Sequence, residues 1–362
     1  MSAYLTPLLK ALHAQKASDL HVSSGHEPML RIGGKLLKLD IPKSSSQEIQ
    51  KVLSEILNQK QLNELKEKKS LDFSIKIENL GIFRVNAFFQ LNGPSIAIRA
   101  LPCIVPTLEE LDLPDILKKI SLYPNGLILI TGPTGSGKTT TLAAIIDYIN
   151  KNKNKHIITL EDPIEYQYSS QKSLIHQRQM GTHFVDFKTA LKSALREDPD
   201  VLLIGEMRDP ETMKLAMTAA ETGHLVLATL HTNSAPKSIH RIVDSFSSSG
   251  EQNQIRSMLS DSLRAIISQK LFVNEQTQKR FALHEVLINN LAIANLIREN
   301  KIHQIKTALQ TGRKEGMILL DDALLKAVRE KKINFKTAWN NAEQKKVFQH
   351  LIDGNSALKK AI

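Results

Sequence analysis

The sequence predicts an α/β protein: a parallel sheet covered by helices on both faces, a smaller α+β domain before it and a helical region after it. Short apolar runs alternate with helix-like stretches through the middle of the chain, as in parallel sheets whose strands are joined by helices. The first hundred residues instead place apolar side chains at every second position, which is typical of an antiparallel sheet with one buried face. Beyond residue 250 the pattern is mainly helical, apart from one hairpin.

The composition is that of an ordinary soluble globular protein. The 362 residues leave room for about two or three domains, and the hydrophobic fraction of 41% and charged fraction of 23% are usual. The longest apolar runs fall far short of the ~20 residues that span a bilayer, and the N-terminus lacks a secretory hydrophobic stretch. The single cysteine, Cys103, excludes an intramolecular disulfide and a multi-cysteine metal site. We expect a cytoplasmic protein.

The chain is basic, with a net charge of +11 and an isoelectric point near 9.5. The charges are spread over short groups, and no aromatic residues are interleaved with them to stack bases. Solvated faces, or attraction to an acidic protein surface or to phosphates, account for the charge as well as nucleic acid does. We therefore expect no specific nucleic-acid partner.

The first domain is expected to combine helices with antiparallel strands. Leucines at helical spacing predict a helix within residues 2–16, and residues 19–22 read as a strand. Gly33-Gly34 separates two alternating runs and predicts a hairpin, because glycine adopts positive φ without steric cost. Ser45 and Glu48 have the spacing of a capping box, which predicts a helix to about residue 58.

Alternation of apolar residues returns after this helix. It predicts three more strands, around residues 71–77, 83–89 and 96–98. We expect the last of them to follow a turn at Gly93-Pro94, because both residues are common in turns. Nothing in the first hundred residues looks catalytic by itself.

A proline-bounded extended stretch, residues 101–106, marks the best domain boundary in the chain. We expect the first domain to cover residues 1–100 and the linker to cover residues 101–112. Thr107 and Glu110 have the spacing of a capping box and predict that a new helix begins there.

Strands and helices alternate from this point. Apolar strands are expected at residues 127–131, 157–160, 201–204 and 225–230. Helices are expected between them, at residues 139–150, 187–196 and 211–221. Asp209-Pro210 provides the cap and the first residue of the third helix. The later hairpin has arms near residues 270–274 and 280–288.

A complete G-x-x-x-x-G-K-[ST] motif follows the first of these strands. Glycines let the backbone wrap a phosphate with its N–H groups turned inward, and the helix that follows adds a positive N-terminal end. Lys138 would reach the β- and γ-phosphates, and the Thr139 hydroxyl would complete the Mg²⁺ shell. The residues expected to bind nucleotide are Gly132, Pro133, Thr134, Gly135, Ser136, Gly137, Lys138, Thr139 and Thr140.

Acidic residues follow the next two strands, at the strand ends where parallel sheets bind ligands. Glu161, Asp162 and Glu165 are candidates for a carboxylate that orients and deprotonates water, or they form only a cap or a surface turn. Glu206 stands where phosphate-loop ATPases usually carry an aspartate, and it would act on Mg²⁺ through water.

Histidines and arginines complete the candidate site. His224 and His231 bracket the fourth apolar strand, which suggests a sensor of the γ-phosphate or its water rather than metal ligands, because no third ligand is near. Charge that develops on the γ-phosphate also favours a guanidinium, often from a neighbouring subunit. The candidates by position are Arg84, Arg99, Arg208 and Arg241.

Four stretches resemble, in order, the nucleotide-site motifs of the secretion-type ATPases, and within that superfamily those of the PilT-type pilus retraction ATPases. They read GPTGSGKTTTLAAIIDYIN, IITLEDPIEY, SALREDPDVLLIGEMRDPET and AAETGHLVLATLHTNSA. SDLHVSSG, GIFRVNAFFQ and HQIKTALQTGRKEGMILLDDAL resemble the flanking regions of the same family. The resemblance covers nearly the whole chain.

The resemblance implies a PAS-like domain over residues 1–100, a RecA-like P-loop ATPase core over residues 113–288 and C-terminal helices over residues 289–362. Arg84 and Arg99 become the preferred charge-stabilising arginines, because the family brings their strands toward the nucleotide. Other roles are carried over by motif position. Lys138 and Thr139 would bind the phosphates and Mg²⁺, and Glu165 would be the general base. Glu206 would be the second acidic residue, and His224 and His231 would form the histidine pair.

The resemblance also implies an activity and partners. The chain would form a homo-hexamer that hydrolyses ATP with Mg²⁺ and drives pilus retraction, pilin depolymerisation and twitching motility. It would act at the cytoplasmic face of the inner membrane on the platform protein at the pilus base, alone or with a paralogous accessory ATPase. Type II secretion and pilus assembly ATPases usually carry a long extra N-terminal region and a four-cysteine metal motif; this chain has neither, which favours retraction. One departure is Ala294, which stands where the family's C-terminal signature has an arginine.

Three alternatives stay open at this point. The chain could be an accessory retraction ATPase or a secretion-system ATPase of the same superfamily. A nucleic-acid-translocating motor shares the RecA-like core, but the sequence lacks recognisable DNA-binding elements. A scaffold that binds nucleotide without hydrolysing it conflicts with the presence of both Glu165 and Glu206.

Overall fold

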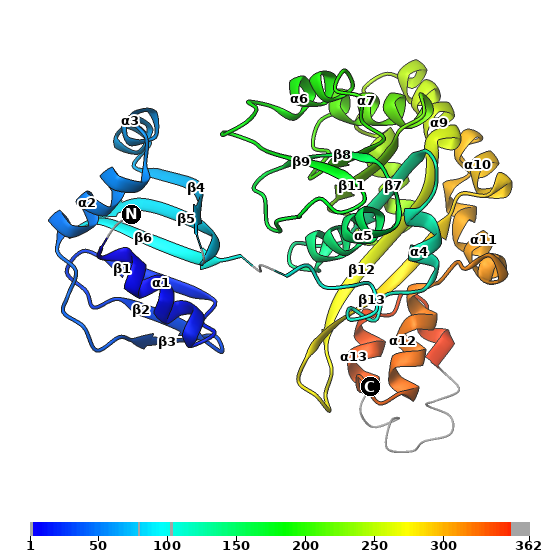
Figure 1. The fold of residues 1–362 in the computed structure, drawn as a ribbon. Helices are drawn as coiled ribbons and strands as arrows, with labels where there is room; N and C mark the ends of the chain where they lie inside the picture. Colours follow the sequence, from blue (N-terminus) through cyan, green and yellow to red (C-terminus); the bar gives the residue numbers. More distant parts are fainter. Residues whose placement is uncertain (1–2, 79, 102–103, 349–362) are drawn as a thin grey trace. The chain divides into compact units, whose positions relative to one another are not determined.

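The computed structural model describes residues 3–78, 80–101 and 104–348, and Figure 1 shows its helices and strands. The chain falls into two compact units. The N-terminal unit comprises Met1–Ile104 with Glu165–Gln167, and the C-terminal unit comprises Val105–Ile164 and Tyr168–Ile362. The predicted α/β fold class is confirmed, because the first unit has an antiparallel sheet and the second a mostly parallel one.

Parts of two predicted regions lie outside the described residues. They are Pro102 and Cys103 of the predicted linker and residues 349–362 of the predicted helical C-terminus. Across the part of the chain that is described, every helix is too short or too polar to cross a lipid bilayer.

The N-terminal unit is a six-stranded sheet with one buried face. In the strand order β3-β2-β1-β6-β5-β4, all neighbours are antiparallel. The strands are β1 (Asp19–Ser23), β2 (Met29–Ile32), β3 (Lys35–Lys38), β4 (Ser70–Ile77), β5 (Gly81–Gln90) and β6 (Gly93–Ala100). The helices are α1 (Leu5–Ala14), α2 (Ser46–Ile56) and α3 (Gln59–Lys68). Alternate strand residues such as Val85 and Ile98 are buried with the leucines of α1 and α2, as the alternation predicts.

Turn and cap chemistry account for the local structure of this unit. Gly33 and Gly34 have φ of 57° and 85° in the β2–β3 hairpin. Ser45 and Glu48 form the predicted capping box at the start of α2. Helix α3 was not predicted; it begins with a second capping box, made by Asn58 and Gln61, which was the overlooked signal.

The predicted turn at Gly93-Pro94 is wrong. The two residues begin β6, and the turn lies at residues 91–92. Proline is tolerated here because the first residues of a strand can lack a ladder N–H.

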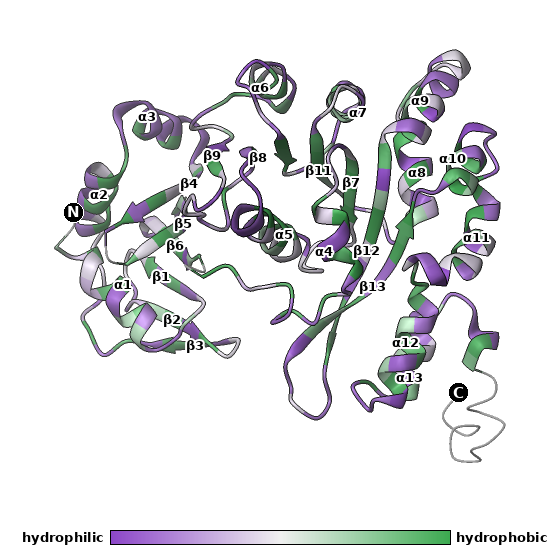
Figure 2. Cartoon of the chain, turned by 45° about the vertical axis from the view of Figure 1, so that its right-hand side comes forward, coloured by the Kyte–Doolittle hydropathy of each residue, from purple (hydrophilic) through white to green (hydrophobic). Residues whose placement is uncertain are grey.

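The C-terminal unit is built on a seven-stranded sheet in the order β13-β12-β7-β11-β10-β8-β9. All neighbours are parallel except β12 and β13. The strands are β7 (Gly126–Thr131), β8 (His156–Glu161), β9 (Leu174–Gln179), β10 (Val201–Ile204), β11 (Leu225–Leu230), β12 (Leu263–Val273) and β13 (Arg280–Ile288). Strand β9 was not predicted, because its sequence LIHQRQ is mostly polar. Figure 2 shows β7 and β11 as apolar over most of their length, as expected of buried parallel strands.

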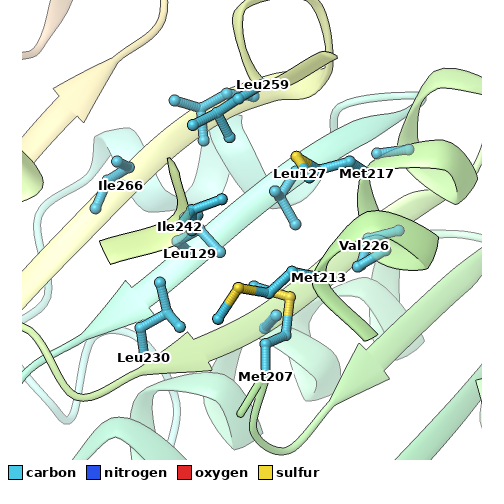
Figure 3. Close-up of a cluster of buried hydrophobic side chains, with 14 of the residues drawn as sticks. Leu127, Leu129, Met207, Met213, Met217, Val226, Leu230, Ile242, Leu259 and Ile266 are labelled. Atoms are coloured by element: carbon cyan, nitrogen blue, oxygen red, sulfur yellow. The ribbon is translucent and has the colours of Figure 1, made fainter. Parts of the chain in front are cut away.

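Helices cover both faces of this sheet. One face carries α4 (Ile116–Ser121) and α5 (Lys138–Asn152), which pack on Ile128 and Ile130 of β7. The opposite face buries Leu127 and Leu129, which lie among methionines and branched side chains in Figure 3. Helices on that face include α6 (Phe187–Ala194), α7 (Pro210–Glu221), α8 (Ala235–Val243), α9 (Ser249–Ser262) and α10 (Leu291–Arg298).

The last described helices extend this unit. They are α11 (Ile305–Thr311), α12 (Leu320–Arg329) and α13 (Phe335–Asn341), with short 3-10 turns at Ile302–Gln304, Gly312–Glu315 and Lys345–Phe348. α12 and α13 enclose a smaller core with Phe272 of β12. The β12–β13 hairpin, yellow in Figure 1, reaches from the central sheet to these two helices.

The helix predicted at Thr107 is wrong. The reciprocal hydrogen bonds of a capping box are present: Thr107 N–H donates to Glu110 Oε2 at 2.8 Å, and Glu110 N–H donates to Thr107 Oγ1 at 3.1 Å. They close only a turn, and α4 begins at Ile116. The turn stops because Asp112 has a left-handed φ of 52° and Pro114 disfavours helical backbone before it.

Candidate nucleotide-binding site

The glycine-rich loop lies at the carboxyl edge of the parallel sheet. β7 ends at Thr131 and α5 begins at Lys138, so the loop is the direct connection between strand and helix. Gly135 and Gly137 have φ of 78° and 88°, in the left-handed region that favours glycine. The strand, loop and helix that phosphate binding requires are therefore all present.

Lys138 is held inside this loop. Its Nζ donates to the carbonyl oxygens of Gly132 at 2.9 Å and Pro133 at 3.1 Å. Its side chain is largely buried, although a lysine is rarely buried unless its charge is satisfied. The ammonium is thus kept where the loop residues converge. Thr139 and Thr140 follow in the first turn of α5.

Glu206 lies in a charged cluster beyond β10. Its Oε2 is 2.8 Å from Nη2 of Arg208, and its Oε1 is 3.4 Å from Nε2 of His231. Burial opposes ionisation of Glu206, but the hydrogen bond from Arg208 and the nearby charges of Arg208, His231 and Lys138 outweigh it and lower the pKa of the carboxyl. Glu206 is therefore a carboxylate at neutral pH, within electrostatic reach of the loop lysine.

His231 joins this cluster to the loop. It follows β11 directly, and its Nδ1 is 3.4 Å from Oγ1 of Thr134. One imidazole ring therefore faces a loop hydroxyl on one side and the Glu206 carboxylate on the other. Of the predicted site residues, Thr134, Lys138, Glu206 and His231 are brought together with Arg208.

His224 lies at the other end of β11. Leu225 is in register with Gly126 and Leu230 with Thr131, so His224 precedes the strand and His231 follows it. At about 3.3 Å per residue, the two ends of this strand are roughly 20 Å apart. Nδ1 of His224 lies 3.0 Å from the carbonyl oxygen of Ala219, away from the loop. The two histidines therefore lie at opposite edges of the sheet, and His224 of this chain does not lie beside its own loop.

The three carboxylates at the end of β8 and in the segment that follows have different surroundings. Glu161 is buried and accepts hydrogen bonds from Thr159 Oγ1 at 2.6 Å and Gln177 Nε2 at 3.2 Å, which fix it within the sheet. Asp162 is exposed. Glu165 is half-buried and belongs to the segment that groups with the N-terminal unit.

The predicted arginines lie in three places. Arg84 and Arg99 face each other across β5 and β6 of the N-terminal unit. Arg99 Nε donates to Asp19 Oδ1 at 2.8 Å. Burial opposes ionisation of Asp19, but the hydrogen bonds from Ser18 and Arg99 outweigh the effect of burial and lower the pKa of Asp19. Arg241 is an exposed residue of α8. Arg208 is the one predicted arginine that pairs with Glu206 among the described residues.

Two residues of β12 that the sequence did not single out lie against the loop. Ser268 Oγ is 2.7 Å from Thr131 Oγ1, and Gln269 Nε2 donates to the Ser136 carbonyl oxygen at 2.6 Å. Both are almost fully buried. Three adjacent polar residues, Ser268, Gln269 and Lys270, interrupt the otherwise apolar run AIISQKLF and were the available signal.

The donor set fits Mg²⁺ that is bound mainly through a nucleotide. Among the described residues, no group of three or more His, Cys, Asp and Glu side chains could hold a metal ion by itself. Mg²⁺ keeps several waters and takes further oxygen ligands from phosphates, so a preformed protein cage is not required. The Thr139 hydroxyl and the ionised Glu206 carboxylate supply the oxygen ligands that this ion prefers.

Comparison with known proteins places the chain among secretion and pilus ATPases. The family model described as "Type II/IV secretion system protein" matches residues 1–360. The chain is 50% identical over 303 residues, 84% of its length and 81% of the relative's, to a "Twitching motility protein" of Neisseria gonorrhoeae. It is 46% identical over 339 residues, 94% of its length and 98% of the relative's, to the "Type IV pilus retractation ATPase PilT" of Pseudomonas aeruginosa. A crystal structure of the pilus retraction motor PilT with bound ADP superposes with a TM-score of 0.89 at 42% identity, covering 95% of this chain and 98% of that one.

Proposed function

Because the chain belongs to the type II/IV secretion system protein family, we propose that it is an ATP-hydrolysing motor that powers retraction of a type IV pilus. The observation that carries the proposal is the 46% identity with a PilT retraction ATPase over 94% of this chain, together with an intact phosphate loop. The relative named for twitching motility supports the same role. Pilin depolymerisation at the pilus base would be the work performed.

The proposed reaction is hydrolysis of ATP to ADP and phosphate. The backbone N–H groups of the loop and the Lys138 ammonium would hold the β- and γ-phosphates, and Thr139 would place its hydroxyl on Mg²⁺. When bound, Mg²⁺ supplies charge neutralisation at the phosphate oxygens. Glu206 is suited to the shell of that ion because it stays ionised.

The attacking nucleophile would be water. Glu165 would accept its proton while the new bond to the γ-phosphorus forms and the bond to the β–γ bridging oxygen breaks. His231, already between Thr134 and Glu206, would hydrogen-bond the γ-phosphate or the water. Arg84 or Arg99 of a neighbouring subunit would stabilise the charge that develops on the transferred group.

This function requires an assembly. We propose a homo-hexamer in which residues 1–100 form a PAS-like domain, 101–112 a linker, 113–288 a RecA-like core and 289–362 a helical region. The ring would work in the cytoplasm against the platform protein of the inner membrane. The formal charge of +11 suits attraction to an acidic surface on such a partner.

A deletion strain tests the biological role. Loss of the gene should abolish twitching motility and leave a surplus of surface pili, and the wild-type gene should restore both. A gene that encodes Lys138→Ala should restore neither, although the variant is produced at the same level. Normal twitching and normal piliation in the deletion strain would refute the role in retraction.

A further inference from the structure

Gln269 of β12 approaches the phosphate loop from the side of the C-terminal hairpin. The first half of β12 pairs in parallel with β7, and Ser268 is in register with Thr131. Gln269 therefore comes level with Gly132, the first residue of the loop. Its side chain is 2% exposed, and its Nε2 donates to the Ser136 carbonyl oxygen at 2.6 Å.

Two loop glycines make this approach possible. A Cβ atom on Gly132 would lie 2.4 Å from the main-chain oxygen of Gln269, a distance that real side chains do not tolerate. A Cβ atom on Gly137 would lie 3.2 Å from Gln269 Nε2. The backbone of Gln269 thus packs against Gly132 at the start of the loop, and its side chain packs against Gly137 at the end.

The hydrogen bond to Ser136 also sets the direction of the next N–H group. A trans peptide is planar, so the Ser136 carbonyl and the Gly137 N–H point in opposite directions. When Gln269 turns the carbonyl toward β12, the Gly137 N–H is turned away from β12. A phosphate-binding loop works by pointing such N–H groups at the phosphate.

We propose that Gln269 is a positioning residue for the nucleotide: it fixes the Ser136–Gly137 peptide so that the Gly137 N–H faces the phosphates. The inference rests on the proposed nucleotide-binding function and adds a part that the loop motif does not contain. Gln269 does not touch the nucleotide itself. It acts on the ground state and the transition state alike, because the loop N–H groups bind the phosphates in both.

The test is Gln269→Met, which keeps the length of the side chain and removes the donor. The matched control is Gln252→Met in α9, where the Gln252 amide also donates to a backbone carbonyl, that of Phe246 at 2.9 Å. Loss of one hydrogen bond predicts ADP binding about 5- to 10-fold weaker for Gln269→Met. KM for ATP should rise by the same factor with kcat within about twofold, because uniform binding is lost. The control should change neither constant.

The outcomes separate the inference from the function on which it rests. If the wild-type protein does not bind ADP, the proposed function fails. If the wild type binds ADP and Gln269→Met binds it equally well, or if Gln252→Met weakens binding as much, only the positioning role is overturned. A fall in kcat with unchanged KM would also overturn it, because it indicates a smaller folded fraction. Should Gln269→Met fail to fold, Gln269→Asn, whose amide is one methylene too short, carries the same expectations.

Discussion

Glu285 is a buried carboxyl whose charge should make stability depend on pH. It lies in β13 with 5% of its surface exposed, and its Oε1 accepts the N–H of Ala235, the first residue of α8, at 2.7 Å. Burial raises the pKa of Glu285 to about 7. The hydrogen bond from the Ala235 N–H and the charge of Lys306 oppose this rise in pKa, and the charges of Glu343 and Asp321 add to it. In the unfolded chain the same group titrates near its ordinary value of 4.5.

The folded chain therefore holds this proton more tightly than the unfolded chain. The contribution of Glu285 to the free energy of unfolding is highest below about pH 4.5, falls as pH rises toward 7 and is level above that. Each pKa unit corresponds to about 1.4 kcal/mol, so the fall amounts to about 3 kcal/mol. Glu285→Gln cannot ionise, and its side-chain oxygen can still accept from Ala235. The variant should be about 3 kcal/mol more stable than the wild type at pH 8 and less than about 1 kcal/mol more stable at pH 5.

Urea denaturation at the two pH values measures this difference. Trp339 is the only tryptophan in the chain and lies in α13, so its fluorescence reports on the C-terminal unit. Asp244→Asn, at an exposed position of the C-terminal unit, is the control for removal of a carboxylate. A Glu285→Gln variant whose gain is equal at pH 5 and pH 8, or which is less stable than the wild type at pH 8, would refute the reasoning.

Two further predictions concern the strand end that carries Glu206 and the helix after it. Glu206→Gln should lower ATP turnover by at least about tenfold while ADP still binds, because the carboxylate is assigned to Mg²⁺ and not to the phosphates. Turnover assays and ADP titration measure the two effects. Unchanged turnover would contradict the assignment. Asp209→Ala should destabilise the C-terminal unit by about 1 kcal/mol, since Asp209 Oδ1 accepts the Thr212 N–H at 2.8 Å as the N-cap of α7. Urea midpoints at pH 7 measure that loss, and a variant as stable as the wild type would show that the cap contributes nothing.

The parallel sheet could be predicted because its local signals agree with its tertiary structure. β7 and β11 are short apolar runs, and a strand with both faces buried shows this pattern irrespective of its neighbours. The loop motif adds glycines where the backbone needs positive φ. Polar residues at the ends of such strands converge without further information, and Glu206 and His231 do lie side by side.

Features that depend on pairing between distant strands could not be predicted in this way. The parallel register of β12 with β7 brings Gln269 to the loop, and no periodicity in β12 reveals it. The sequence shows that His224 and His231 bracket one strand, but only the pairing of that strand shows that His224 lies at the edge away from the loop. Local signals also compete: the Thr107 capping box forms in full, yet a left-handed Asp112 ends the turn at once.

Phosphate release by the purified chain tests the central claim most directly. Lys138, whose ammonium is held inside the loop, is changed to alanine, and Lys151→Ala, an exposed position of the same helix that pairs with Asp147 at 2.6 Å, is the control. With saturating ATP and Mg²⁺, the wild type and Lys151→Ala should turn over at similar rates, and Lys138→Ala should be at least about 100-fold slower. A Lys138→Ala variant that hydrolyses ATP within a few-fold of the wild-type rate would contradict the account.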